Sequence, residues 1–152
     1  MRKIILCLMF CTILAGCGKY ENAEVSVEEI AKAVAESENV YITGAKKITS
    51  VRDSAEYGIS TEEIEDGVII AFPNNGETDR IVVIKAKNHD GLENAERGLK
   101  NRVNTLMQAY KYNQRERDKL DKHFLKTRGM YVMLTIGSNA KEAEKVFDKL
   151  IN

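Results

Sequence analysis

The second half of the chain contains two successive β-hairpin patterns, each followed by a helical pattern, and this order constrains the fold more than any other feature. The four β-rich runs lie at residues 68–72, 81–86, 123–127 and 130–136. Pro73 and Asn75-Gly76 separate the first two runs, and Arg128-Gly129 separates the last two. Turn-forming residues between two β-rich runs are typical of hairpins. This pattern therefore predicts two β-hairpins.

Expected helix starts share one pattern, in which Ser, Asp or Asn is followed three positions later by Glu. The two side chains satisfy free backbone N–H groups at a helix N-terminus. The pairs are Ser26 with Glu29, Ser60 with Glu63, Asp90 with Glu93, and Asn139 with Glu142. Apolar residues recur at helical spacing behind the first, third and fourth pairs. Gly67 follows the second pair so closely that we expect only a turn or two there.

These patterns predict an α+β domain of two layers, with helices packed on an antiparallel four-stranded sheet made of two hairpins. Strand-strand-helix is repeated twice after an N-terminal helix, and we expect the two later helices on one face. The repetition reflects either an internal duplication or the shared physics of such units. Residues 38–58 fit no period and are interpreted as a connector that can include a short strand at Asn39 to Thr43.

Alternation along the strands divides their side chains between the two faces of the sheet. The residues expected to point at the two later helices are Val82, Ile84, Val132, Leu134 and Ile136. The opposite face would carry Ile81, Val83, Lys85, Tyr131, Met133 and Thr135. Either the first helix folds across this face, or the face remains a patch suited to a partner. We favour the first alternative, because the apolar side of that helix needs burial, and we keep the six residues as a possible interaction surface.

The N-terminal residues differ in character from the rest of the chain. Two basic residues precede an apolar run at residues 4–14, which is shorter than the roughly 20 residues that span a bilayer. The run closes on Leu14-Ala15-Gly16-Cys17, which resembles the lipobox of bacterial lipoproteins. This resemblance implies that the Cys17 sulfur receives a diacylglycerol before cleavage. The alternative is an ordinary secretory signal, with Cys17 as an incidental free thiol.

We therefore expect three parts: a cleaved lipoprotein signal peptide at residues 1–16, a lipidated cysteine and tether at 17–24, and a single domain at 25–152. A diacylglyceryl cysteine carries two acyl chains, and one chain alone gives only marginal membrane binding. The membrane is thus the first expected partner, on the extracytoplasmic side of a Gram-positive type of cell. Because Cys7 and Cys11 lie in the signal, the mature chain can form no internal disulfide.

Composition and motifs exclude several functional classes. The chain has 23 basic and 23 acidic residues, a balance that argues against a nucleic-acid partner. It contains no Walker loop, HExxH, GxSxG or paired CxxC motif. The two histidines, His89 and His123, are interpreted as surface or capping residues. We therefore expect no cofactor, no metal site and no catalytic residue.

Two charged clusters have alternative interpretations. Glu62, Glu63, Glu65 and Asp66 offer oxygen ligands for calcium, but they lack the alternating pattern of a calcium loop, and carboxylates also favour helix starts. The second cluster is basic and consists of Lys111, Arg115, Arg117, Lys119, Lys122, Lys126 and Arg128. It can face anionic headgroups or wall polymers. Interspersed acids favour a solvated, salt-bridged face instead.

Three segments carry a resemblance to a known family. They are YGISTEEIEDGV, DRIVVIKAKNHDGLENAERGL and RGMYVMLTIGSNAKEAEKVFDKL. In this order they resemble the successive blocks of a bacterial lipoprotein family, domain of unknown function 4358, over roughly residues 25–151. The resemblance implies a location and a fold. It implies no activity, substrate or catalytic residue.

Three functional hypotheses follow. The first is a lipid-anchored extracytoplasmic membrane lipoprotein that acts as a non-enzymatic interaction module with an envelope protein partner. The second is a small-molecule or peptide binder that serves an envelope transporter or sensor, and it predicts a pocket between the sheet and the helices. The third is an envelope hydrolase that uses carboxylates such as Glu62, Glu63 or Asp66.

Overall fold

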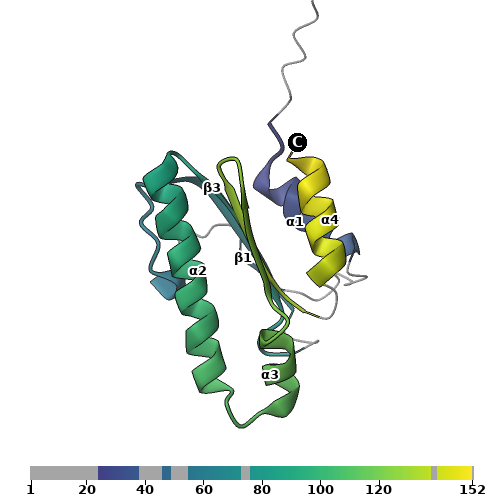
Figure 1. The fold of residues 1–152 in the computed structure, drawn as a ribbon. Helices are drawn as coiled ribbons and strands as arrows, with labels where there is room; N and C mark the ends of the chain where they lie inside the picture. The colour runs from purple at the N-terminus through teal and green to yellow at the C-terminus, as the bar shows by residue number, and fades with distance from the viewer. Residues whose placement is uncertain (1–23, 38–45, 49–54, 73–75, 138–139, 152) are drawn as a thin grey trace, which may run out of the picture.

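The computed structural model describes residues 24–37, 46–48, 55–72, 76–137 and 140–151, which form a sheet with helices on both faces (Figure 1). In chain order the elements are α1 (Val27–Ser37), β1 (Lys46–Ile48), the 3₁₀ turn η2 (Ala55–Tyr57), β2 (Ile64–Ala71), β3 (Arg80–Ala86), α2 (His89–Ala109), α3 (Gln114–Leu120), β4 (Phe124–Arg128), β5 (Tyr131–Ile136) and α4 (Ala140–Leu150). Among these described elements, no helix is both long enough and apolar enough to cross a membrane.

The predicted α+β class and the two antiparallel hairpins are confirmed. The strand order is β1-β2-β3-β5-β4, so the hairpins β2-β3 and β4-β5 join through the central pair β3 and β5. The short strand β1 adds a fifth strand beside β2. It lies at Lys46–Ile48, whereas the strand considered at Asn39 to Thr43 falls outside the described residues.

The alternation of side chains along the central strands is also confirmed. On one face, Val82, Ile84, Val132, Leu134 and Ile136 pack with α2 residues such as Leu99 and Val103. On the other face, Ile81, Val83 and Met133 pack with α1 and with Phe147 of α4. Each face of the sheet thus carries its own apolar core.

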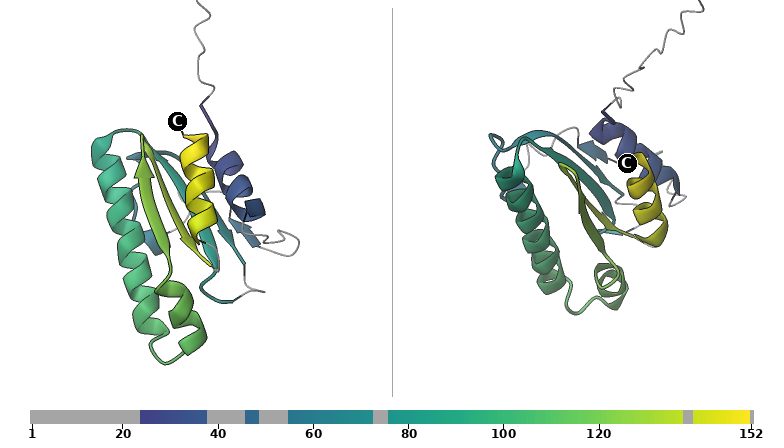
Figure 2. Two further views of the ribbon diagram at one scale, coloured as in Figure 1. Left: turned by 45° about the vertical axis from the view of Figure 1, so that its right-hand side comes forward. Right: turned by 45° about the horizontal axis from the view of Figure 1, so that its top comes forward.

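The expectation that both later helices share one face is wrong. Figure 2 shows α2 on one side of the sheet and α4 beside α1 on the other. Alternation tells which strand residues share a face, but it does not tell which helix covers them. The favoured alternative for the first helix is correct, because Ile30 and Val34 of α1 are fully buried against the face opposite α2.

Helix starts agree only in part with the predicted pairs. At α1, the backbone N and Oγ of Ser26 donate to Glu29 at 3.0 Å each, as predicted. At α2, the N-cap residue is Asn88 and not the expected Asp90. The Asn88 Oδ1 accepts from the Gly91 N–H at 2.8 Å. Ser60 begins only a turn before β2, and Asn139 falls outside the described residues.

The helix α3 was not predicted. Its sequence is almost entirely polar, and only Glu116 and Leu120 are buried. A seven-residue helix with so little apolar surface has no recognisable period. Its position depends on contacts to a distant loop, which are described below.

Candidate functional site

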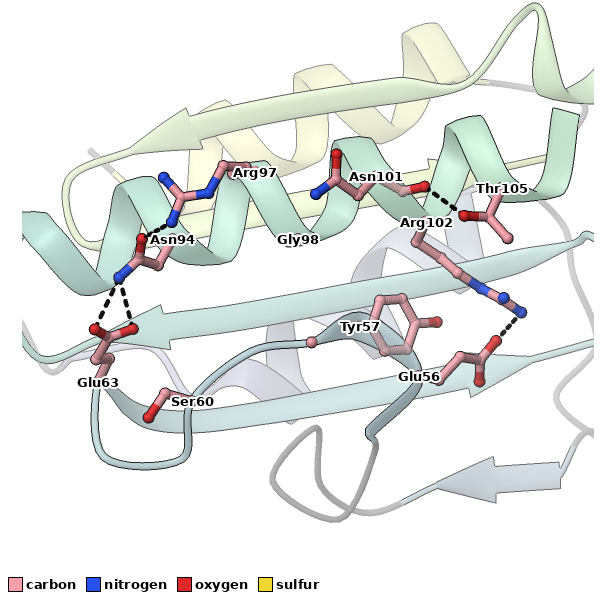
Figure 3. Close-up of a pocket in the computed structure, with 11 residues that line it drawn as sticks. Glu56, Tyr57, Ser60, Glu63, Asn94, Arg97, Gly98, Asn101, Arg102 and Thr105 are labelled. Carbon is pink, nitrogen blue, oxygen red and sulfur yellow. Dashed lines mark hydrogen bonds and ion pairs between the residues drawn. The ribbon is translucent and has the colours of Figure 1, made fainter. Parts of the chain in front are cut away.

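A groove of about 450 Å³ runs between the outer face of α2 and residues 56–63 (Figure 3). Most of the side chains that line it are polar: Glu56, Ser60, Glu63, Asn94, Arg97, Asn101, Arg102 and Thr105. The second hypothesis predicted a pocket between the sheet and the helices. The groove instead lies on the outside of α2, so this location differs from the prediction.

Two glycines within α2 allow residues 57–63 to lie directly against the helix. A Cβ atom at Gly98 would lie 2.6 Å from the backbone oxygen of Tyr57, and one at Gly91 would overlap the backbone oxygen of Glu63. Any other residue would push this segment away, although glycine costs about 1 kcal/mol relative to alanine in a helix. The two glycines therefore allow residues 57–63 to form one wall of the groove.

At one end of the groove, the side-chain amide of Asn94 bonds to two charged residues. The Asn94 Nδ2 donates to both carboxylate oxygens of Glu63 at 2.8 Å, and the Asn94 Oδ1 accepts from Arg97. Asn94 thus joins an acidic and a basic side chain that come from different segments. Next along the helix, the exposed Asn101 amide faces the groove as a donor and an acceptor.

Two guanidinium groups share one carboxylate at the other end. The Glu56 Oε1 accepts from Arg80 Nη1 at 3.1 Å and also pairs with Arg102. The Arg102 side chain is 20% exposed, and burial lowers the pKa of its guanidinium. Its Nε–H has no hydrogen-bond partner among the described residues. Of the two arginines, only Arg102 lines the groove, and it supplies the guanidinium group at this end.

Arg80 is fully engaged within the fold. Its Nε donates to Thr78 O at 3.1 Å, its Nη1 also donates to the Tyr57 hydroxyl at 3.3 Å, and its Nη2 donates to Glu77 O at 3.2 Å. These bonds fix the start of β3 to η2. The groove can therefore offer amide, hydroxyl and guanidinium groups to a polar ligand on a rigid frame.

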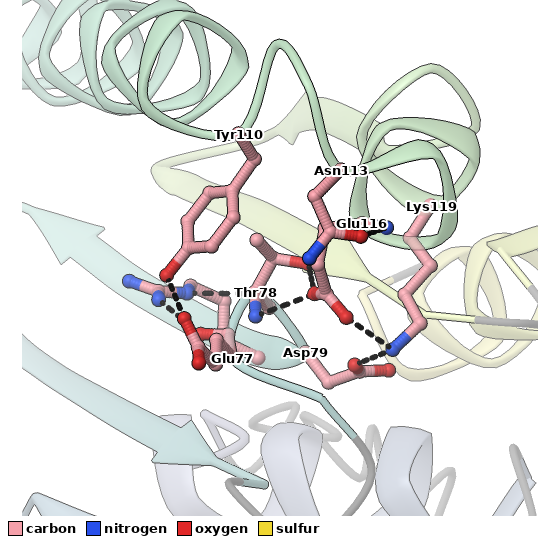
Figure 4. A network of polar contacts seen from close by, with 8 residues as sticks. Glu77, Thr78, Asp79, Tyr110, Asn113, Glu116 and Lys119 are labelled. Carbon is pink, nitrogen blue, oxygen red and sulfur yellow. Dashed lines mark hydrogen bonds and ion pairs between the residues drawn. The ribbon is translucent and has the colours of Figure 1, made fainter.

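A second polar network joins α3 to the loop before β3 (Figure 4). The Glu116 Oε2 accepts from the Thr78 backbone N–H at 3.1 Å and from its hydroxyl at 2.6 Å, while Lys119 pairs with Asp79 and with Glu116. Burial alone would raise the pKa of Glu116, but the Thr78 hydrogen bonds and Lys119 outweigh it, so that this pKa is lowered. The carboxylate remains charged and holds α3 in place.

The possible interaction surface on the sheet is not exposed. Ile81, Val83, Lys85, Tyr131, Met133 and Thr135 are all buried. The reason is that α1 and α4 together cover this face, and their own apolar sides need the same burial. The alternative of an open patch at these residues is therefore wrong.

Lys85 and Tyr131 instead hold the start of the domain. The Tyr131 hydroxyl donates to Val25 O at 2.8 Å, and the Lys85 Nζ pairs with Glu24 at 2.6 Å and with Glu65 at 2.9 Å. Burial would lower the pKa of Lys85, but the hydrogen bonds to Glu24 and Glu65 outweigh it and raise this pKa. We call these contacts to Glu24 and Val25 the N-terminal clasp.

The acidic cluster has separate partners. Glu63 accepts from Asn94, Glu65 pairs with Lys85, and Asp66 accepts from the Gly67 N–H at 2.8 Å. Glu62 is exposed at the turn before β2. Within the described part of the chain, no three His, Cys, Asp or Glu residues gather where a metal ion could bind.

Internal ion pairs engage much of the basic cluster, as the salt-bridged interpretation predicts. Lys119 pairs with Asp79 and Glu116, Lys126 with Glu144 and Asp148, Arg128 with Asp148, and Arg117 with Asp121. Lys111 and Arg115 are exposed at or near the turn between α2 and α3, and Lys122 is exposed in the turn between α3 and β4. The exposed basic residues of the cluster thus lie at the two ends of α3.

The histidines and Cys17 complete the predicted residues. His89 is exposed at the first position of α2, and the His123 Nδ1 lies 2.6 Å from Leu120 O at the end of α3. Both positions agree with surface or capping roles. Cys17 falls outside the described residues, so its lipidation stays a prediction.

The comparison with protein-family profiles shows which family this chain belongs to. The profile of the domain of unknown function (DUF4358) matches residues 39–137 of this chain of 152 residues. The chain belongs to this family. The match omits α1 and α4, which the resemblance at residues 25–151 included. No curated protein and no solved structure matches the chain.

Proposed function

We propose that this family member is a lipid-anchored protein on the extracytoplasmic side of the cell membrane, and that it works by binding another envelope component. The sequence Leu14-Ala15-Gly16-Cys17 at the end of an apolar run carries the proposal. A diacylglyceryl group on Cys17 would supply the two acyl chains that durable anchoring needs.

The start of the described domain supports this arrangement. Glu24 lies seven residues after Cys17, and seven extended residues span at most about 25 Å. The N-terminal clasp holds Glu24 and Val25 against the end of β3 and the start of β5. A short tether that leads into a fixed contact would keep the domain close to the membrane.

Metabolic labelling tests the anchor. Cells that express the full chain are grown with an alkyne-bearing palmitate analogue, and the membrane fraction is examined for the labelled protein. Wild type should be labelled and should sediment with membranes, whereas Cys17→Ala should lose both properties. Cys11→Ala is the matched control and should keep both. Equal labelling of wild type and Cys17→Ala would contradict the proposal.

The groove favours a second candidate function, in which the domain binds a small polar molecule or a short peptide. Its supporting observation is the volume of about 450 Å³ with amide, hydroxyl and guanidinium groups facing it. In both proposed functions the protein binds a partner and catalyses no reaction. The partner is another envelope component in the first and a small polar molecule or short peptide in the second.

A thermal-shift screen of polar metabolites and short peptides tests this candidate. Asn101→Leu changes a residue that lines the groove, while Asn104→Leu changes an exposed residue of α2 that does not. A groove ligand should stabilise wild type and Asn104→Leu but not Asn101→Leu. A ligand that stabilises all three proteins equally binds elsewhere and would contradict the assignment.

A further inference from the structure

The turn between α2 and α3 exposes an aromatic side chain. We call residues 110–115 the tip. Within it, Tyr112 is 91% exposed, and no other large hydrophobic side chain of the described residues is so accessible. The Lys111 Nζ lies 4.8 Å from the centre of the Tyr112 ring, and Arg115 is also exposed. Because Tyr112 buries almost no surface, it adds little to the stability of the fold.

The fold nevertheless holds the tip in one position. On one side, the Tyr110 hydroxyl donates to Glu77. On the other, the Asn113 Oδ1 accepts from the Glu116 N–H at 3.3 Å, and Glu116 is fixed by Thr78. An aromatic side chain presented on a rigid turn loses little conformational freedom on binding, which favours its use as an anchor in an interface.

The charged residues of the tip itself are both basic. Residues 110–115 contain Lys111 and Arg115 and no acidic residue. Three acids lie near the tip: Glu116 is 4% exposed, the exposed Asp118 accepts from the Gln114 amide at 2.6 Å, and the exposed Glu77 accepts from the Tyr110 hydroxyl. Within the tip, the charges closest to Tyr112 in the chain are those of Lys111 and Arg115, and they suit an acidic partner.

The tip lies at the opposite end of the domain from the N-terminal clasp. Figures 1 and 2 show α1 beginning and α4 ending at one end, with the α2-α3 turn at the other. The helix α2 has 21 residues and is therefore about 30 Å long. On a protein tethered through its N-terminus, the tip would face away from the membrane.

We propose that the tip is a docking surface for an acidic segment of a second envelope protein. This inference rests on the proposed binding function and names its surface and partner class. Tyr and Arg are enriched where protein interfaces gain most of their affinity. An anionic wall polymer would engage the two basic residues but leave the Tyr112 ring in water, and for this reason we favour a protein.

Photocrosslinking in intact cells tests the inference with the full, lipidated chain. Benzoylphenylalanine replaces Tyr112 in one strain and the exposed Glu93, near the other end of α2, in a control strain. The crosslinked peptide is identified by mass spectrometry. Position 112 should capture a peptide rich in Asp or Glu that position 93 does not capture.

Charge reversal provides the matched comparison. Adding K111E and R115E should reduce the position-112 product about tenfold or more, since each lost charge pair at an interface rim weakens binding. Reversing two exposed lysines on α1 and α4, in K32E/K141E, changes the net charge equally and should leave the product unchanged. Thermal melting verifies that each variant folds.

Several outcomes would overturn the docking surface: equal capture at positions 93 and 112, a captured peptide without acidic residues, capture of a polymer instead of a protein, or no effect of K111E/R115E. Fractionation of the same cells separates the two proposals. Recovery of the chain in the soluble fraction would contradict the anchor, while the crosslinking result would still decide the role of the tip.

Discussion

Arg80 and Glu116 illustrate how single polar side chains position the segments outside the sheet. Arg80 reaches four acceptors and joins β3 to η2, whereas Glu116 joins α3 to the loop before β3. Both are nearly inaccessible to water. A buried charge of this kind costs free energy unless it is fully hydrogen-bonded, so the partners of each residue are as important as the residue itself.

Gly98→Ala should destabilise the protein although alanine favours helices. The added Cβ would lie 2.6 Å from the Tyr57 backbone oxygen, so residues 57–63 must move. We expect a loss of about 1–3 kcal/mol in the free energy of unfolding, as for other overpacked sites. Urea denaturation measures it. The exposed Asn104→Ala, on the same helix, is the control and should not destabilise the protein.

Glu116→Gln should change how stability depends on pH. Because the folded-state pKa of Glu116 is lowered from 4.5, its contribution is fully present above about pH 4.5 and is lost as pH falls through the folded-state value. Wild type should thus be more stable at pH 7, and its advantage over Glu116→Gln should shrink below pH 4.5. Melting temperatures across this range measure the effect. A constant difference at all pH values would contradict it.

At the scale of elements, sequence patterns predicted the features that depend on neighbouring residues, namely the hairpins and the two faces of each strand. Turn residues and alternation located the two hairpins, and the alternation gave the correct partition of Val82 and Ile84 from Ile81 and Val83. The side on which each helix packs was not predictable, because α2 and α4 both have one apolar stripe and either face of the sheet could receive it.

The candidate sites were less predictable than the fold. The groove depends on residues 56–63 lying against α2, and the contacting residues are about 30 to 45 positions apart in the chain. Gly91 and Gly98 inside a helical pattern were the available signal, since interior glycines often mark a close approach of another backbone. The exposure of Tyr112 could not be predicted for a different reason. Whether one aromatic side chain is exposed depends on the whole surrounding surface.

Tyr131→Phe should loosen the attachment of α1 to the sheet. The substitution removes the hydrogen bond of 2.8 Å to Val25 O and leaves that oxygen without this donor. We expect a loss of about 1 kcal/mol and faster hydrogen exchange in the first turn of α1. Mass spectrometry of exchanged peptides measures it. Tyr112→Phe removes an exposed hydroxyl and should leave the exchange of α1 unchanged.

At the scale of the whole molecule, the sheet separates two apolar cores. One lies under α2, and the other lies under α1 and α4, which come from opposite ends of the domain. The family profile ends before α4 and begins after α1. The matched region therefore contains one complete core and only the sheet side of the second.

A chain limited to residues 39–137 should not form a stable soluble domain. Without α1 and α4, the side chains of Ile81, Val83 and Met133 would lie on an open face. An apolar surface of this kind favours aggregation. We expect strong binding of a hydrophobic dye and loss of the monomer peak in size-exclusion chromatography, compared with residues 24–152. A soluble monomer with cooperative unfolding would contradict this expectation.

The N-terminal clasp has a mechanical consequence. Tension on an anchored N-terminus reaches the fold at Glu24 and Val25 and passes through Lys85 and Tyr131 into β3 and β5. These are central strands of the sheet, and each is paired on both sides. A load applied there is shared across the most extensively bonded part of the molecule, whereas a load on an edge strand would meet a single ladder. A domain pulled through its N-terminus would therefore resist the load as one unit.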